Sequence, residues 1–161
     1  MAVELTRNKP KILVVDDDAR LADNLLEYLN RLGYAARAAY NGKEALEAYA
    51  EDDFSVVITD LMMPEMDGME LLISIRKLDP DAVVILLTGY GTIESAVSAI
   101  KAGAFDYITK PIKLQEVEVT ILRALERDHI FSRMRRFRSL FFISVGVVAL
   151  CLIALLVLLL G

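Results

Sequence analysis

The feature that most constrains the fold of this chain is a regular alternation of short apolar runs and amphipathic segments over its first 112 residues. Apolar runs typical of buried strands occur at 11–15, 34–39, 54–59, 82–87 and 105–108. Between them, apolar residues recur at helical spacing over 19–32, 42–50, 69–78 and 92–102, and a further helix begins near Leu114. Strands that alternate with helices in this way predict an α/β fold, in which a parallel sheet is covered by helices on both faces.

Single residues mark several of the expected boundaries. Gly33 and Gly103 follow the first and fourth helical segments, where glycine commonly ends a helix. Asp18 directly precedes the first helical segment, and we expect it to cap that helix rather than to bind a metal. Asp67 and Asp106 are expected to be loop residues.

Polar residues gather where a doubly wound sheet binds its ligands, beyond the carboxyl ends of the strands. With strand order 2-1-3-4-5, the third strand lies between the first and the fourth. The residues that would then converge at one edge of the sheet are Asp16, Asp17, Asp60, Thr88 and Lys110. Clustered carboxylates raise one another's pKa, and an oxygen-only ligand set with room for water suits Mg²⁺. A carboxylate nucleophile, a metal, an ammonium and a hydroxyl are the groups that phosphoryl transfer to an aspartate uses.

Residues 11–125 resemble the receiver domain of two-component response regulators. Four segments carry the resemblance, at 12–18, 60–68, 87–91 and 103–111, and they read ILVVDDD, DLMMPEMDG, LTGYG and GAFDYITKP. The later segments are most similar to receivers attached to AAA+ transcription activators. The resemblance implies a flavodoxin-like, doubly wound, five-stranded parallel sheet.

The same resemblance implies a role for each matching residue. Asp60 would be the phosphoacceptor for a sensor histidine kinase or a phosphotransfer protein. The Mg²⁺ ligands would be Asp16, Asp17, Asp60 and the backbone carbonyl of Met62. Lys110 would contact the phosphoryl group, and the Lys110–Pro111 bond would be cis. Thr88 would turn toward the phosphoryl group and Tyr107 would pack inward after it, which would alter the surface formed by the fourth helix, the fifth strand and the fifth helix. Such a domain catalyses only its own phosphorylation and dephosphorylation.

Two other functions fit part of the pattern. Asp16 and Asp18 form an Asp-x-Asp after a strand, as in haloacid-dehalogenase-like phosphohydrolases, but that reading leaves Asp60 and the loop after it unexplained. A membrane adaptor that has lost phosphotransfer is the second alternative. Tyr107 also has a second interpretation, as a half-buried aromatic of an edge strand.

The end of the chain differs from the rest because no residue from Ser139 onward is charged. The 21 residues of 140–160, at about 1.5 Å per residue, are long enough to cross a hydrocarbon core of about 30 Å. We therefore expect 139–161 to be a transmembrane helix. Four arginines, at 133, 135, 136 and 138, precede it and predict a cytoplasmic N-terminal domain at the inner membrane, with a single span.

These observations divide the chain into a tail at 1–10, a receiver domain at 11–125, a basic juxtamembrane helix or linker at 126–138, and the span at 139–161. A net charge of −5 argues against direct nucleic-acid binding. The lipid bilayer and a second copy of the chain are the other expected partners. The apolar residues at 114, 117, 121 and 125 are consistent with a coiled-coil seam or with a helix packed on the sheet.

Overall fold

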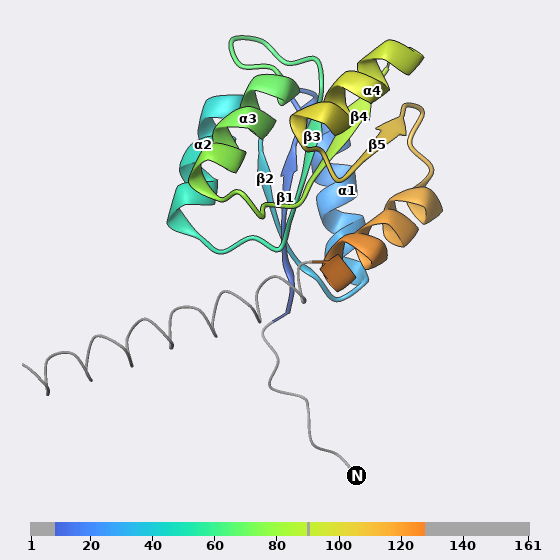
Figure 1. Ribbon diagram of the computed structural model, residues 1–161. Coiled ribbons are helices and arrows are strands. Elements are labelled where there is room, and N and C mark those ends of the chain that lie inside the picture. Colours follow the sequence, from blue (N-terminus) through green and yellow to red (C-terminus); the bar gives the residue numbers. More distant parts are fainter. Residues whose placement is uncertain (1–8, 90, 128–161) are drawn as a thin grey trace, which may run out of the picture. The chain divides into compact units, whose positions relative to one another are not determined.

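The computed structural model describes residues 9–89 and 91–127, and within them an α/β domain with a central parallel sheet (Figure 1). The strands are β1 (Lys11–Val15), β2 (Ala35–Ala39), β3 (Val56–Asp60), β4 (Val84–Thr88) and β5 (Asp106–Thr109). Their order in the five-stranded sheet is β2-β1-β3-β4-β5, and all pairs are parallel. The predicted fold class and strand order are therefore confirmed.

Helices cover both faces of this sheet. They are α1 (Ala19–Arg31), α2 (Gly42–Glu51), α3 (Gly68–Leu78) and α4 (Ile93–Ala102), and residues 114–127 form a further helix. Asp18 caps α1, since its side chain accepts a hydrogen bond from the Arg20 N–H. Gly33 and Gly103 have φ angles of +92° and +100°, so the left-handed conformation at each of these positions explains why glycine follows the helix.

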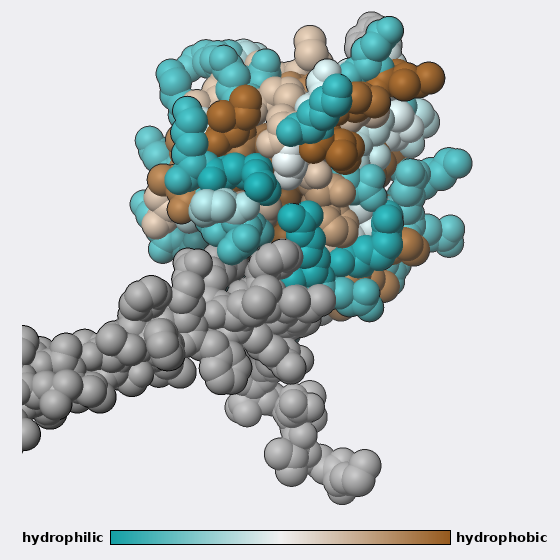
Figure 2. Space-filling view, viewed as in Figure 1, coloured by the Kyte–Doolittle hydropathy of each residue, from teal (hydrophilic) through white to brown (hydrophobic). Residues whose placement is uncertain are grey.

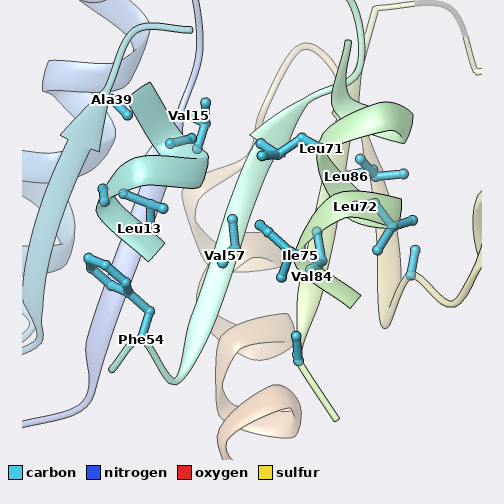
Figure 3. Packing of buried hydrophobic residues seen from close by; sticks show 14 of the residues in the cluster. Leu13, Val15, Ala39, Phe54, Val57, Leu71, Leu72, Ile75, Val84 and Leu86 are labelled. Atoms are coloured by element: carbon cyan, nitrogen blue, oxygen red, sulfur yellow. The ribbon is translucent and has the colours of Figure 1, made fainter. Parts of the chain in front are cut away.

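Alternate residues of each buried strand point to opposite faces, which gives the domain two apolar layers. Leu13, Val57 and Leu86 pack with α2, α3 and Ala99 of α4 on one face (Figure 3). Ile12, Ile58 and Ile85 pack with α1 and the 114–127 helix on the other face. Because β1, β3 and β4 are covered on both sides, their sequences are continuously apolar.

Three of the four apolar residues that the sequence placed on one face of the 114–127 helix face the sheet. Val117, Ile121 and Leu125 are buried in the apolar layer, whereas Leu114 is exposed. The described part of this helix is thus a receiver helix packed on the sheet.

β1 has the predicted bounds and β2 begins one residue late, whereas β3, β4 and β5 begin one or two residues later and end one residue later than their predicted runs. Phe54 and Ala82 are buried but precede β3 and β4, because burial extends beyond the paired residues. Asp60 and Thr88 are in turn the last residues of β3 and β4 rather than residues that follow them.

No helix within residues 9–89 and 91–127 is long and apolar enough to cross a membrane. The predicted span at 139–161, and all but two residues of the predicted linker at 126–138, lie outside the described residues. Most of the predicted tail at 1–10 also lies outside them.

We expect Gly103→Ala to lower the free energy of unfolding by about 1–3 kcal/mol, because alanine is strained at positive φ. An added Cβ would also lie 2.5 Å from Arg76 Nε. Gly89→Ala is the matched control, since no atom lies within 4 Å of a Cβ at that position. Denaturant unfolding of both variants measures the difference, and equal stabilities would contradict the assignment of a strained helix end.

Candidate functional site

Three carboxyl groups meet at the carboxyl end of the sheet. Asp16 follows β1, Asp17 comes next, and Asp60 ends β3; one side-chain oxygen from each lies within 4.8 Å of those of the others. Val15 pairs with Thr59 in the parallel ladder, so Asp16 and Asp60, the residues after that pair, lie side by side. Asp16 is 1% exposed and Asp60 5% exposed, whereas Asp17 is open to solvent.

Lys110 brings the positive charge of this site. Its Nζ lies 2.8 Å from Asp16 Oδ2 and 3.0 Å from Asp60 Oδ1, so one ammonium bridges two buried carboxylates. The backbone N–H of Lys110 donates to the carbonyl of Thr88 at 2.7 Å, which holds the chain after β5 against the end of β4. The Lys110–Pro111 bond is cis, as the family resemblance implied. The sequence predicts an ammonium in this group but not its pairing with Asp16.

The burial of these charges changes their proton affinities. Desolvation raises the pKa of Asp60, and nearby Asp16 adds to the increase, while the Lys110 ammonium opposes it. Burial by itself would lower the pKa of Lys110, but its contacts with Asp16 and Asp60 outweigh that effect, so the pKa rises. Lys110 therefore stays charged at neutral pH, and its ammonium favours the ionised form of Asp60 against the cost of burial.

The donor set fits a hard divalent cation such as Mg²⁺. The Oδ1 atom of Asp60 is buried, and it faces the Lys110 ammonium at 3.0 Å. Asp16 Oδ1 accepts from the Asp18 N–H at 2.9 Å, which orients that carboxylate. One ammonium facing three carboxyl groups leaves an excess of negative charge, and exposed Asp17 leaves room for water ligands. Met62, whose carbonyl is the fourth predicted ligand, lies in the loop two residues after Asp60, and its role stays a prediction.

The loop after β3 is closed tightly beneath Asp60. The Gly68 N–H donates to the Leu61 carbonyl at 2.9 Å, and a Cβ on Gly68 would collide with the backbone carbonyl of Asp60. Asp67, which we expected to be a loop residue, caps α3 in a reciprocal capping box with Glu70. The spacing Asp-x-x-Glu is the signal in the sequence that could have predicted this cap.

Thr88 and Tyr107 lie on the neighbouring strands β4 and β5. Thr88 is buried and pairs in register with Thr109, the residue before Lys110. Tyr107 is half-buried, and its hydroxyl is buried without a hydrogen-bond partner among residues 9–89 and 91–127. A Cβ on Gly91 would lie 2.8 Å from that hydroxyl, so the ring reaches the loop that follows β4. The movement of Thr88 toward a phosphoryl group, followed by inward packing of Tyr107, stays a prediction.

Asp106 is not the loop residue that we expected. It begins β5 and accepts a 2.8 Å hydrogen bond from Arg123 of the 114–127 helix. Asp106 also lies inside the strand predicted at 105–108, and it is this strand assignment that is confirmed.

Comparison with known proteins agrees with this geometry. The response regulator receiver domain family matches residues 12–122. The chain belongs to this family. Its receiver domain is 38% identical over 125 residues to the transcriptional regulatory protein ZraR of Escherichia coli K12, covering 78% of this chain and 28% of ZraR. It is also 38% identical over 120 residues to YkoG, an uncharacterized transcriptional regulatory protein of Bacillus subtilis, covering 74% of this chain and 53% of YkoG.

Solved receiver structures have the same fold. The response regulator receiver domain protein from Clostridium thermocellum superposes with a TM-score of 0.73 at 36% identity, covering 76% of this chain and 98% of that chain. The chain thus spans nearly all of a solved receiver domain but only part of the length of ZraR and YkoG. The match to transcriptional regulators agrees with the expected likeness to receivers of transcription activators.

We expect Asp60→Asn to raise the melting temperature by a few degrees at neutral pH in EDTA, because the amide removes a buried charge. The raised pKa gives the sign: Asp60 stabilises the fold most below its ordinary pKa of 3.8, and that contribution is lost as pH rises through the higher folded-state value.

Calorimetry with added Mg²⁺ provides the control for this prediction. The wild-type protein should gain more stability from the ion than Asp60→Asn does, since the variant lacks one carboxylate ligand. A lower melting temperature for the variant in EDTA would show that the Asp60 carboxylate is not a destabilising charge.

Proposed function

We propose that this chain is a membrane-anchored response regulator receiver that accepts a phosphoryl group on Asp60 from a sensor histidine kinase or a phosphotransfer protein. The observation that carries the proposal is the position of the Lys110 ammonium between Asp16 and Asp60, beside a third carboxylate at Asp17. These groups come from three separate strand ends, and together they supply a nucleophile, a cation and a metal-ligand set.

The transfer step needs little covalent chemistry from the protein. A carboxylate oxygen of Asp60 attacks phosphorus while the P–N bond of the donor phosphohistidine breaks, and the electron pair leaves with the imidazole nitrogen. The Lys110 ammonium favours the ionised form of Asp60 before transfer and lies close enough to contact a phosphoryl oxygen afterwards. Asp16, Asp17 and Asp60 would hold Mg²⁺ together with the Met62 carbonyl, and the ion would neutralise charge on the phosphoryl oxygens.

The new charge at Asp60 changes the surface formed by α4, β5 and the 114–127 helix. Thr88 turns its hydroxyl toward the phosphoryl group and Tyr107 packs inward after it. Ile93, Val97 and Ile100 of α4 are exposed at helical spacing and form an apolar ridge on this surface (Figure 2). An exposed apolar ridge of this kind is suited to binding another protein surface. A second copy of the chain is one occupant of this ridge, which makes phosphorylation a control of dimerisation.

The receiver domain at 11–125 is tethered to the inner membrane. The charge-free segment at 139–161 spans the bilayer, and the arginines of the 126–138 linker keep the receiver on the cytoplasmic side. The chain acts as a signalling domain rather than as a classical enzyme, and it has no direct nucleic-acid target.

The arrangement of the site disfavours the phosphohydrolase alternative. That enzyme would use an aspartate after the first strand as its nucleophile. Asp16, however, accepts hydrogen bonds at both carboxylate oxygens, from the Asp18 N–H and from Lys110. Asp60 faces the same ammonium at 3.0 Å, and that enzyme would leave this second buried carboxylate at the end of β3 unexplained.

Incubation with acetyl phosphate and Mg²⁺ tests the proposed function, with phosphate-affinity electrophoresis as the readout. We expect stoichiometric labelling of the wild-type chain and loss of essentially all label in Asp60→Asn. Asp18→Asn is the matched control: it changes a neighbouring exposed carboxylate, and asparagine caps a helix about as well as aspartate. A wild-type chain that takes no label would instead favour the phosphorylation-incompetent adaptor.

Membrane anchoring is tested by fractionating bacterial cells that express the full chain or a version ending at residue 127. The full chain should remain in the membrane pellet after alkaline extraction, because a span of about 20 apolar residues inserts stably. The shorter version should be found in the supernatant. A full chain that is released by alkaline extraction would contradict the anchor.

A further inference from the structure

The loop that follows β3 contains a strained turn that the proposed chemistry does not use. Glu65 has a φ angle of +65°, the one positive value that a non-glycine residue adopts within the described ranges. The Met66 N–H donates to the Pro64 carbonyl at 2.7 Å, which closes a three-residue turn centred on Glu65. A hydrogen bond from one residue to the carbonyl two positions before it, with a positive φ angle at the residue between them, is typical of the classic γ-turn. This turn is rare and strained. Contacts from elsewhere in the fold must therefore hold it.

The first turn of α2 supplies two such contacts. Lys43 Nζ lies 2.6 Å from Glu65 Oε2, so an ion pair holds the centre of the turn from outside. Gly42 lies directly against the next residue, since a Cβ there would be 2.7 Å from Met66 Cγ and 2.8 Å from the Met66 carbonyl. Asn41 caps α2 by accepting from the Glu44 N–H, which sets where this helix begins. The close approach at Gly42 and the ion pair at Lys43 thus act on adjacent residues of one turn.

The strained turn is linked to the phosphoacceptor by short covalent and hydrogen-bonded connections. The loop between Leu61 and Gly68 is closed by the hydrogen bond that joins those two residues. Gly68 also packs onto the backbone carbonyl of Asp60. We therefore expect a displacement at Glu65 and Met66 to change the path of the backbone at Asp60, the last residue of β3, and at Met62 in the loop.

We propose that Gly42 and Lys43 are positioning residues for phosphorylation, which hold the loop after β3 in the conformation that binds Mg²⁺ and presents Asp60. Neither residue touches the reacting atoms, and their effect passes through Glu65 and Met66. This inference rests on the proposed function, because it assigns Asp60 as the phosphoacceptor.

Removing the ion pair changes the affinity for Mg²⁺, and the direction of this change distinguishes a positioning role from a simple effect of charge. Lys43 is a cation, and loss of a cation near an acidic site should by charge alone strengthen Mg²⁺ binding. Loss of a positioning contact should instead weaken it. Because the side chains of the pair are 66% and 69% exposed, we expect a modest two- to fivefold weakening, which corresponds to about 0.4–1 kcal/mol at 1.4 kcal/mol per tenfold.

The experiment uses the full chain in mild detergent and compares wild type with Lys43→Met. Isothermal titration calorimetry gives the Mg²⁺ dissociation constant, and acetyl phosphate gives the labelling rate at subsaturating and saturating Mg²⁺. Amide hydrogen exchange at Met66, measured without Mg²⁺, reports the turn itself. We expect a two- to fivefold higher dissociation constant, a slower rate mainly at subsaturating Mg²⁺, and faster exchange at Met66, with Lys43→Arg restoring all three.

Lys11→Met is the matched control. Lys11 pairs with Asp52 at the same 2.6 Å distance, but it does so at the opposite end of α2 and of β1. This variant should change none of the three readouts. In a Glu65→Gly background, in which glycine tolerates positive φ, Lys43→Met should have no further weakening effect because its partner is absent.

Unchanged or tighter Mg²⁺ binding in Lys43→Met would overturn the inference, as would unchanged exchange at Met66. Equal effects in Lys11→Met would overturn it too, since they would reflect loss of a surface charge in general. Failure of the proposed function gives a different result. The wild-type chain would then take no label on Asp60, while amide exchange at Met66 could still be compared between wild type and Lys43→Met.

Discussion

The site depends on a single ammonium that compensates two buried carboxylates. Without Lys110, burial of Asp16 and Asp60 side by side would favour protonation of one of them, and a protonated carboxyl is a poor nucleophile. The ion pairs of 2.8 and 3.0 Å therefore decide the chemistry of the site as well as its stability. The burial of Asp60 makes its charge sensitive to any change at Lys110.

The parallel sheet is what allows one ammonium to serve both carboxylates. Pairing of β1 with β3 aligns Asp16 with Asp60, and pairing of β4 with β5 sets Thr88 beside Thr109, the residue before Lys110. The two apolar layers on either side of the sheet hold these strand ends in register. The carboxyl edge of the sheet can therefore carry repelling charges because the apolar contacts beneath it stabilise the arrangement.

Much of the fold and the membership of the acidic group could be predicted from residue patterns. Continuous apolar runs identify β1, β3 and β4 because these strands are buried on both faces, and helical spacing identifies α1 and α3. The limits of β3 and β4 were displaced, since apolar residues such as Phe54 and Ala82 are buried before the paired residues begin. Asp67 and Asp106 were assigned to loops. The spacing to Glu70 could have predicted the helix cap at Asp67, but nothing local to Asp106 reveals that it meets an arginine from a distant segment.

The sequence by itself determined the periodic pattern of the fold and the residue types at the strand ends, because strand and helix periods depend on local spacing. Only the tertiary structure decided that Lys110 meets Asp16 as well as Asp60, and that Lys43 holds the turn at Glu65. These partners are 94 and 22 residues apart in the chain for Asp16–Lys110 and Lys43–Glu65. No local period in the sequence encodes contacts over such separations. The register of the sheet brings Lys110 to Asp16, and the start of α2 brings Lys43 to Glu65.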